Sequence, residues 1–60
     1  MKGSDIKALR LKLGLSQMMM AVELGVSLQS VHRWEVGKAR PSQLAERRLK
    51  ELANGGGHES

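Results

Sequence analysis

The sequence predicts an all-α fold, a small bundle of four helices in one domain. Apolar residues recur every three or four positions, as on one side of a helix, and no stretch shows the alternation typical of a strand. Serines that can cap helices precede these stretches, and glycines follow most of them. The chain has 60 residues and no cysteine, so neither a disulfide nor a cysteine-bound zinc can reinforce its small core. Helix packing must therefore stabilise the fold.

The first predicted helix begins at Ser4, which can cap it, and ends at Gly14. Ile6, Leu9 and Leu13 lie at the i, i+3, i+7 spacing of one apolar stripe. Glycine suits the end of a helix because it readily adopts a positive φ. We expect the three apolar side chains in the core.

Two short helices follow, each preceded by a serine that can cap it, Ser16 or Ser27. The first of them runs to Gly25 and the second to Glu35. Helical spacing predicts their inner faces, which consist of Met20, Ala21 and Leu24 in the first and Val31 and Trp34 in the second.

A basic loop, Lys-Ala-Arg-Pro-Ser, leads to the fourth helix. Pro41 excludes an interior helical position in this loop, and Ser42 can cap the helix that follows. The predicted apolar stripe of this helix consists of Leu44, Ala45, Leu49 and Leu52. The domain therefore spans residues 1–53, and the glycine-rich residues 54–60 are expected to form a disordered tail.

The charge balance favours an anionic partner. Ten Lys and Arg against six Asp and Glu give a net charge of +4 and a pI near 10.2. Trp34 is the only aromatic residue, so the chain lacks the stacking platforms that single-stranded nucleic acid needs. No apolar run could span a bilayer, and the first residues contain no apolar signal core. We therefore expect a cytoplasmic protein with no membrane partner.

Only Gly25 and Val26 separate the second and third predicted helices. So short a connection holds two helices at a steep angle, the helix-turn-helix arrangement. Gly25 allows the sharp turn, and Val26 is expected to be a buried apolar plug. The helix from Ser27 to Glu35 can then protrude and fit the major groove of DNA.

Residues 10–42 resemble the Cro and phage-repressor type of helix-turn-helix, also called the xenobiotic-response-element family. The matching positions, in order and at the correct spacing, are Arg10, Leu15-Ser16-Gln17, Ala21, Leu24-Gly25-Val26-Ser27, Val31, Trp34-Glu35, Gly37-Lys38 and Pro41-Ser42. The resemblance implies a lambda-repressor-like bundle of four or five helices that binds double-stranded DNA. It also implies a bacterial, archaeal or phage origin.

By this resemblance, the third helix carries the residues that face DNA bases: Leu28, Gln29, His32 and Arg33. Their chemistry agrees, because Gln29 can form two hydrogen bonds with adenine and Arg33 can do so with guanine. His32 can donate or accept a hydrogen bond, and Leu28 can pack on a thymine methyl group. A solvated cation is the alternative for Arg33. We expect no metal site at His32, because the only other histidine, His58, lies in the predicted tail.

The resemblance also implies a set of phosphate contacts: Gln17, Ser27, Ser30, Lys38, Arg40 and Ser42. Gln17 begins the second helix, where free N–H groups attract an anion. These contacts would set the register of the protein on DNA, whereas the third helix would select the sequence.

Four further residues are expected to have structural roles. Arg10 and Glu35 correspond to a pair that forms an internal ion bridge in the family, and Val31 and Trp34 are core residues. The charged residues of the fourth helix are expected to form a solvated face, which consists of Glu46, Arg47, Arg48, Lys50 and Glu51.

Met18 and Val22 lie one helical turn apart on the second helix, and we expect their side chains to form an exposed apolar ridge. The family often has glutamates at Met18 and Met19, which would suit the helix dipole. Two interpretations remain open. The ridge is either an ordinary group of surface apolar residues or a contact surface for a partner or a second copy.

The sequence supports three functions. The leading one is a sequence-specific DNA-binding transcriptional regulator, a repressor, acting as a homodimer on half-sites ~34 Å apart. The second is the antitoxin of a toxin–antitoxin pair, with a toxin protein as partner. The third is a protein-interaction module that uses the fold without DNA. We expect no enzyme, cofactor or small-molecule substrate, because no nucleophile with a base and no metal cluster is present.

Overall fold

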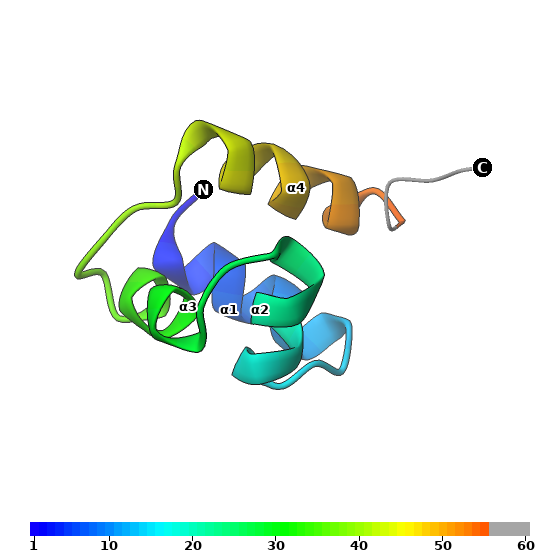
Figure 1. Cartoon of the computed structure of the whole chain (residues 1–60). Helices are drawn as coiled ribbons and strands as arrows, with labels where there is room; N and C mark the ends of the chain where they lie inside the picture. Colours follow the sequence, from blue (N-terminus) through cyan, green and yellow to red (C-terminus); the bar gives the residue numbers. More distant parts are fainter. Residues whose placement is uncertain (56–60) are drawn as a thin grey trace.

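The computed structural model describes residues 1–55 and shows four helices and no strand in this range (Figure 1). The helices are α1 (Gly3–Lys12), α2 (Gln17–Leu24), α3 (Leu28–Glu35) and α4 (Gln43–Ala53). The predicted all-α class is thus confirmed, and residues 1–55 contain no fifth helix. Most of the predicted tail, residues 56–60, lies outside the described residues. No helix in residues 1–55 is long and apolar enough to cross a membrane.

Three of the four predicted helix caps are confirmed. The hydroxyl oxygens of Ser16, Ser27 and Ser42 accept hydrogen bonds from the backbone N–H groups of Met19, Ser30 and Ala45, at 3.0, 3.1 and 3.2 Å. Each bond satisfies one of the N–H groups that the start of a helix leaves without a partner.

The cap predicted at Ser4 is wrong, because α1 begins at Gly3 and its N-cap is Lys2. The backbone N–H of Lys2 donates to the carboxylate of Asp5 at 3.1 Å. A side chain at position 3 would collide with the carbonyl oxygen of Trp34 in α3, so only Gly3 allows this approach. The first turn of α1 therefore packs directly against the end of α3.

The core contains side chains from all four helices. Its buried members are Ile6, Met20, Ala21, Leu24, Val31, Trp34, Ala45 and Leu49. Partly buried side chains pack around them, namely Leu9, Leu15, Val26, Ala39 and Leu52. Val26, expected to be a buried plug, is thus only partly buried, at the edge of this core.

Two predicted core positions are wrong. Leu13 is 41% exposed because α1 ends at Lys12, so the turn and not the helical period sets the direction of its side chain. Leu44 is 56% exposed. It lies one residue before Ala45 and is therefore rotated by about 100° around α4 from the buried stripe.

The helices α2 and α3 form the helix-turn-helix unit, and α1 and α4 support it (Figure 1). Helix α1 packs on α3, whereas α4 packs on α2. Gly25 ends α2 with a φ of +71°. The N–H of Val26 then donates to the carbonyl of Ala21 at 3.0 Å, which closes the turn. Helices α1 and α2 thus pack against α3, and another face of α3 stays free of contacts with the rest of the described chain.

Candidate nucleic-acid interface

The free face of α3 carries the four residues expected to face bases. Leu28 and His32 are one turn apart, as are Gln29 and Arg33, and all four side chains are exposed. The opposite side of α3 is buried through Val31 and Trp34, which fixes the orientation of the helix. A single helix with its side chains is about 10–12 Å wide, which matches a major groove about 12 Å wide. The structure therefore leaves these four side chains accessible to a duplex.

The serines at the start of α3 already have hydrogen-bond partners. The Oγ atoms of Ser27 and Ser30 lie 2.9 Å apart, and either of them can donate to the other. Ser27 also accepts from the N–H of Ser30, as described above. Ser27 is exposed and Ser30 is half-buried, so Ser27 is the more accessible of the two to a phosphate.

A partly buried network joins the end of α1, the start of α2 and the end of α3. Arg10 donates to the carboxylate of Glu35 through Nε at 2.7 Å and through Nη2 at 3.1 Å. The Nη1 of Arg10 donates to the carbonyl of Leu15 at 3.0 Å. Gln17, expected at a phosphate, donates its Nε2 to Glu35 at 3.1 Å. The network thus holds the start of α2 against the end of α3.

The charge of Glu35 is stabilised within this network. Burial alone would raise the pKa of Glu35, but hydrogen bonds from Arg10 and Gln17 and the positive charges of Arg10 and Lys7 outweigh it. The pKa of Glu35 therefore lies below its ordinary value. Hydrogen bonding to Glu35 also raises the pKa of Arg10, although burial acts against it. Both groups are charged at neutral pH.

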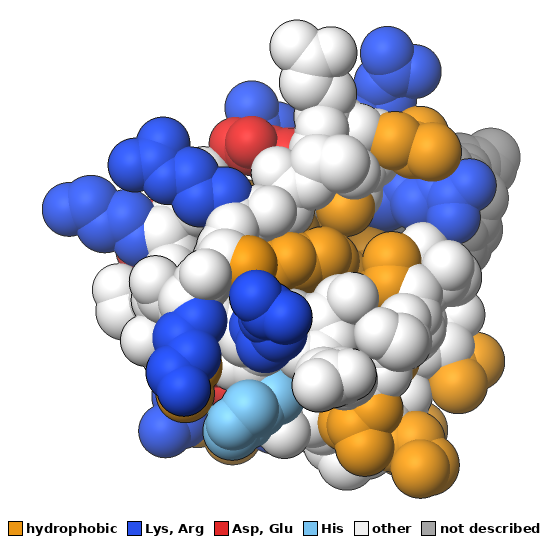
Figure 2. All heavy atoms as spheres, turned by 60° about the vertical axis from the view of Figure 1, so that its left-hand side comes forward, with side chains coloured by type: hydrophobic (Ala, Val, Ile, Leu, Met, Phe, Trp, Pro, Cys, Tyr) orange, Lys and Arg blue, Asp and Glu red, His pale blue; other side chains and the backbone are white. Residues whose placement is uncertain are grey.

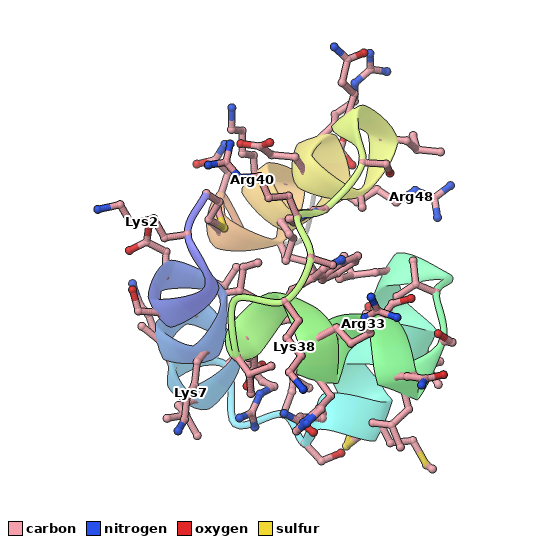
Figure 3. The ribbon with its side chains drawn as sticks, turned by 90° about the vertical axis from the view of Figure 1, so that its left-hand side faces the viewer. Lys2, Lys7, Arg33, Lys38, Arg40 and Arg48 are labelled. Atoms are coloured by element: carbon pink, nitrogen blue, oxygen red, sulfur yellow. The ribbon has the colours of Figure 1, made fainter. Side chains whose placement is uncertain are left out.

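Positive charge dominates the surface around α3. Between Leu24 and Ala45 the sequence has a single carboxylate, Glu35, which Arg10 neutralises. Arg33, Lys38 and Arg40 are exposed, and Figure 3 shows them on the face that turns toward the viewer. In Figure 2, several Lys and Arg side chains gather on the left of the view, near a histidine, while other cations lie at the upper right beside apolar side chains. This distribution favours a polyanion over α3 and the loop after it.

The loop between α3 and α4 is held against the end of α3. The backbone N–H of Lys38 donates to the carbonyl of Arg33 at 2.9 Å. The Oγ of Ser42 caps α4, and this serine is exposed. Figure 3 shows two of the expected phosphate contacts, Lys38 and Arg40, on the same side of the molecule as Arg33, whereas Gln17 binds Glu35 within the network.

The expectation of a merely solvated face on α4 is wrong for Arg48. Its Nη1 donates to the carbonyl of Leu24 at 2.9 Å, which satisfies the last turn of α2. Arg47 remains exposed, and Lys50 forms only a surface pair with Glu46, at 3.9 Å. No local sequence signal indicates the contact of Arg48, because its partner lies 24 residues away.

Residues 1–55 contain no group of three or more metal-ligating side chains. Their arrangement is that of a helix-turn-helix protein, with the second helix of the motif exposed. A family model described as helix-turn-helix matches residues 6–55, so the chain belongs to this family, which is the Cro/C1, lambda-repressor-like type. No curated protein and no solved structure matches the chain. The family match supports a DNA-binding helix-turn-helix domain.

Proposed function

We propose that this domain is a transcriptional repressor that binds a specific sequence of double-stranded DNA with α3 in the major groove. The observation that carries the proposal is the free face of α3, where polar and apolar side chains project beside unneutralised cations. Gln29 suits adenine and Arg33 suits guanine, because each can form two hydrogen bonds with the edge of that base. His32 adds a hydrogen-bond donor or acceptor, and Leu28 adds an apolar contact for a thymine methyl group.

Phosphate contacts would hold α3 in register. Lys38, Arg40 and Ser42 supply them on one side of α3, and the exposed Ser27 supplies one at its start. Ser30 contributes through its own hydroxyl, which is hydrogen-bonded to the hydroxyl of Ser27. Gln17 retains one amide hydrogen and the free N–H groups at the start of α2 for an anion, while its other hydrogen binds Glu35.

One module contacts few base pairs, so its own affinity is modest. A homodimer that reads two half-sites about one helical turn apart, ~34 Å, would multiply it. The alternative is an antitoxin that represses its own gene and binds a toxin protein. Exposed apolar side chains on α2, at Met18 and Val22, favour such a protein partner. Co-purification of a small toxin protein with the domain would support the antitoxin function.

The decisive experiment is selection from random duplex DNA, followed by sequencing of the bound pool. An enriched motif establishes specific binding, and its symmetry and spacing reveal a dimer. A pool that stays random after repeated rounds refutes a sequence-specific function and favours a protein-interaction module.

The roles of Arg33 and Lys38 predict different effects of mutation. Arg33→Ala removes a base contact, so it should cost ~1–3 kcal/mol at the selected site and relax the preference for one base pair. Lys38→Ala removes a phosphate contact. It should weaken binding to all sequences alike and lower the salt dependence, the slope of log K against log salt concentration, by about 0.9. Titrations of each variant with the selected duplex and with a random duplex distinguish the two roles. If each variant loses the same affinity for the random duplex as for the selected one, the roles of Arg33 and Lys38 are contradicted.

A further inference from the structure

Three cations surround the C-terminal end of α3, and one of them comes from α1. Arg33 belongs to the last turn of α3, and Lys38 lies in the loop that is bonded to that turn. Lys7 belongs to α1, and Figure 3 shows it at the lower margin of the face that presents Arg33 and Lys38. Within residues 1–55, none of the three takes part in an ion pair.

The position of Lys7 follows from its place in α1. Gly3, Lys7 and Arg10 lie at i, i+4 and i+7, so they share one side of the helix. Gly3 packs against the backbone of Glu35, and Arg10 binds the carboxylate of Glu35. Lys7 lies between these two contacts and therefore stands beside the end of α3, with its side chain exposed.

The local charges leave Lys7 available to an anion. The side chain of Glu35 is 4% exposed, and both of its oxygens are bound by Arg10 and Gln17. The C-terminal end of a helix adds a partial charge of only about −0.5. The charges of Lys7, Arg33 and Lys38 exceed it, so this end of α3 has a net positive charge.

We propose that Lys7 binds a backbone phosphate of the duplex together with Lys38, at the C-terminal end of α3. The inference rests on the proposed function and extends it, because it adds α1 to the elements that contact DNA. Lys7 would then help to fix the position of α3 along the groove through a contact at the C-terminal end of α3. A lysine that only offset the helix dipole would affect folding and not the binding of DNA.

Lys12 provides a matched control for Lys7. Both are exposed lysines of α1, and replacing either with Ala removes one positive charge. Lys12 lies about 140° around the helix from Lys7, on a different side of α1. Thermal unfolding of both variants checks that they fold, and their affinities for the selected duplex are then measured over a range of salt concentrations.

We expect Lys7→Ala to lower the salt slope by about 0.9 and Lys12→Ala to leave it unchanged. A duplex with one neutral methylphosphonate at the contacted phosphate should weaken binding by the wild-type protein more than binding by Lys7→Ala, which keeps only the contact of Lys38. An unchanged slope for Lys7→Ala, or an equal decrease in both variants, overturns the inference. A wild-type domain with no salt-dependent duplex binding refutes the proposed function itself, which is a different result.

Discussion

One carboxylate, that of Glu35, joins α1, α2 and α3. It accepts hydrogen bonds from Arg10 and Gln17, and its side chain is 4% exposed against 11% for Arg10. A buried charge that loses its partner is costly, so the fold depends on both members of this pair. The same contacts hold the start of α2 and the end of α3, which both border the proposed DNA interface.

The lowered pKa of Glu35 predicts a specific dependence of stability on pH. The unfolded chain takes up this proton near the ordinary value of 4.5, whereas the folded protein takes it up at lower pH. The stabilisation is therefore complete above 4.5 and is lost as the pH falls through the lowered pKa of the folded state. In urea unfolding, the free energy by which the wild type exceeds Glu35→Gln should decrease as the pH falls below about 4.5.

Glu51→Gln serves as the control, because Glu51 is an exposed carboxylate on α4. Its free energy of unfolding should follow that of the wild type over the whole range. If the difference in free energy of unfolding between the wild type and Glu35→Gln stays constant with pH, Glu35 is not the group that links protonation to folding.

Helix-ending glycines show how α4 holds the helix-turn-helix unit. Gly14 and Gly25 have nearly the same φ, +72° and +71°. A Cβ at Gly14 would meet open space, whereas a Cβ at Gly25 would lie 2.9 Å from Nη1 of Arg48. That nitrogen donates to the carbonyl of Leu24, so a side chain at position 25 would disturb the bond that ties α4 to the turn.

We therefore expect Gly25→Ala to lower the free energy of unfolding more than Gly14→Ala does. Each change forces a non-glycine residue into a left-handed conformation, at a cost of about 1–2 kcal/mol. Gly25→Ala should cost about 1 kcal/mol more through the loss of the hydrogen bond from Arg48. Urea unfolding measures both, and in an Arg48→Met background the two costs should become equal. Equal costs with Arg48 present would show that this contact contributes nothing to the turn.

Local signals in the sequence predicted most of the fold. The caps at Ser16, Ser27 and Ser42 and the turn at Gly25 were predictable because each depends on residues within one helical turn. Ser4 and Leu13 were mispredicted because contacts with α3 and the end of α1 decide the two ends of that helix. The free face of α3 follows from the positions of its buried residues.

The contacts that the sequence did not reveal join residues far apart in the chain. Arg48 lies 24 residues from Leu24, and Gln17 lies 18 residues from Glu35. No periodicity or cap reports such pairs. The Arg10–Glu35 pair, 25 residues apart, was expected only through the resemblance to a family. The sequence likewise did not indicate that Lys7 lies beside the end of α3, because this depends on how α1 packs against α3.

At the scale of the whole molecule, several exposed apolar side chains lie on α2 and α4, outside the proposed DNA-binding face of α3. Met18 and Val22 on α2 are 61% and 74% exposed, and Leu44 on α4 is 56% exposed. A homodimer on two half-sites needs a surface of this kind, and α2 and α4 each offer one. Either group is small against the roughly 800 Å² per partner of a stable interface, so self-association should be weak in free solution. DNA would strengthen it by holding two copies close together.

Sedimentation at high protein concentration distinguishes the two surfaces. If the ridge of Met18 and Val22 is the contact between copies, the double change Met18→Glu and Val22→Lys places charges in it and should shift the protein toward the monomer. Both side chains are exposed, so the stability of the monomer should change by less than about 0.5 kcal/mol for each. Leu44→Glu introduces the same kind of charge on α4 and should leave the sedimentation unchanged. The reverse result assigns the contact to α4, and a protein that sediments alike in all three forms uses neither surface to pair.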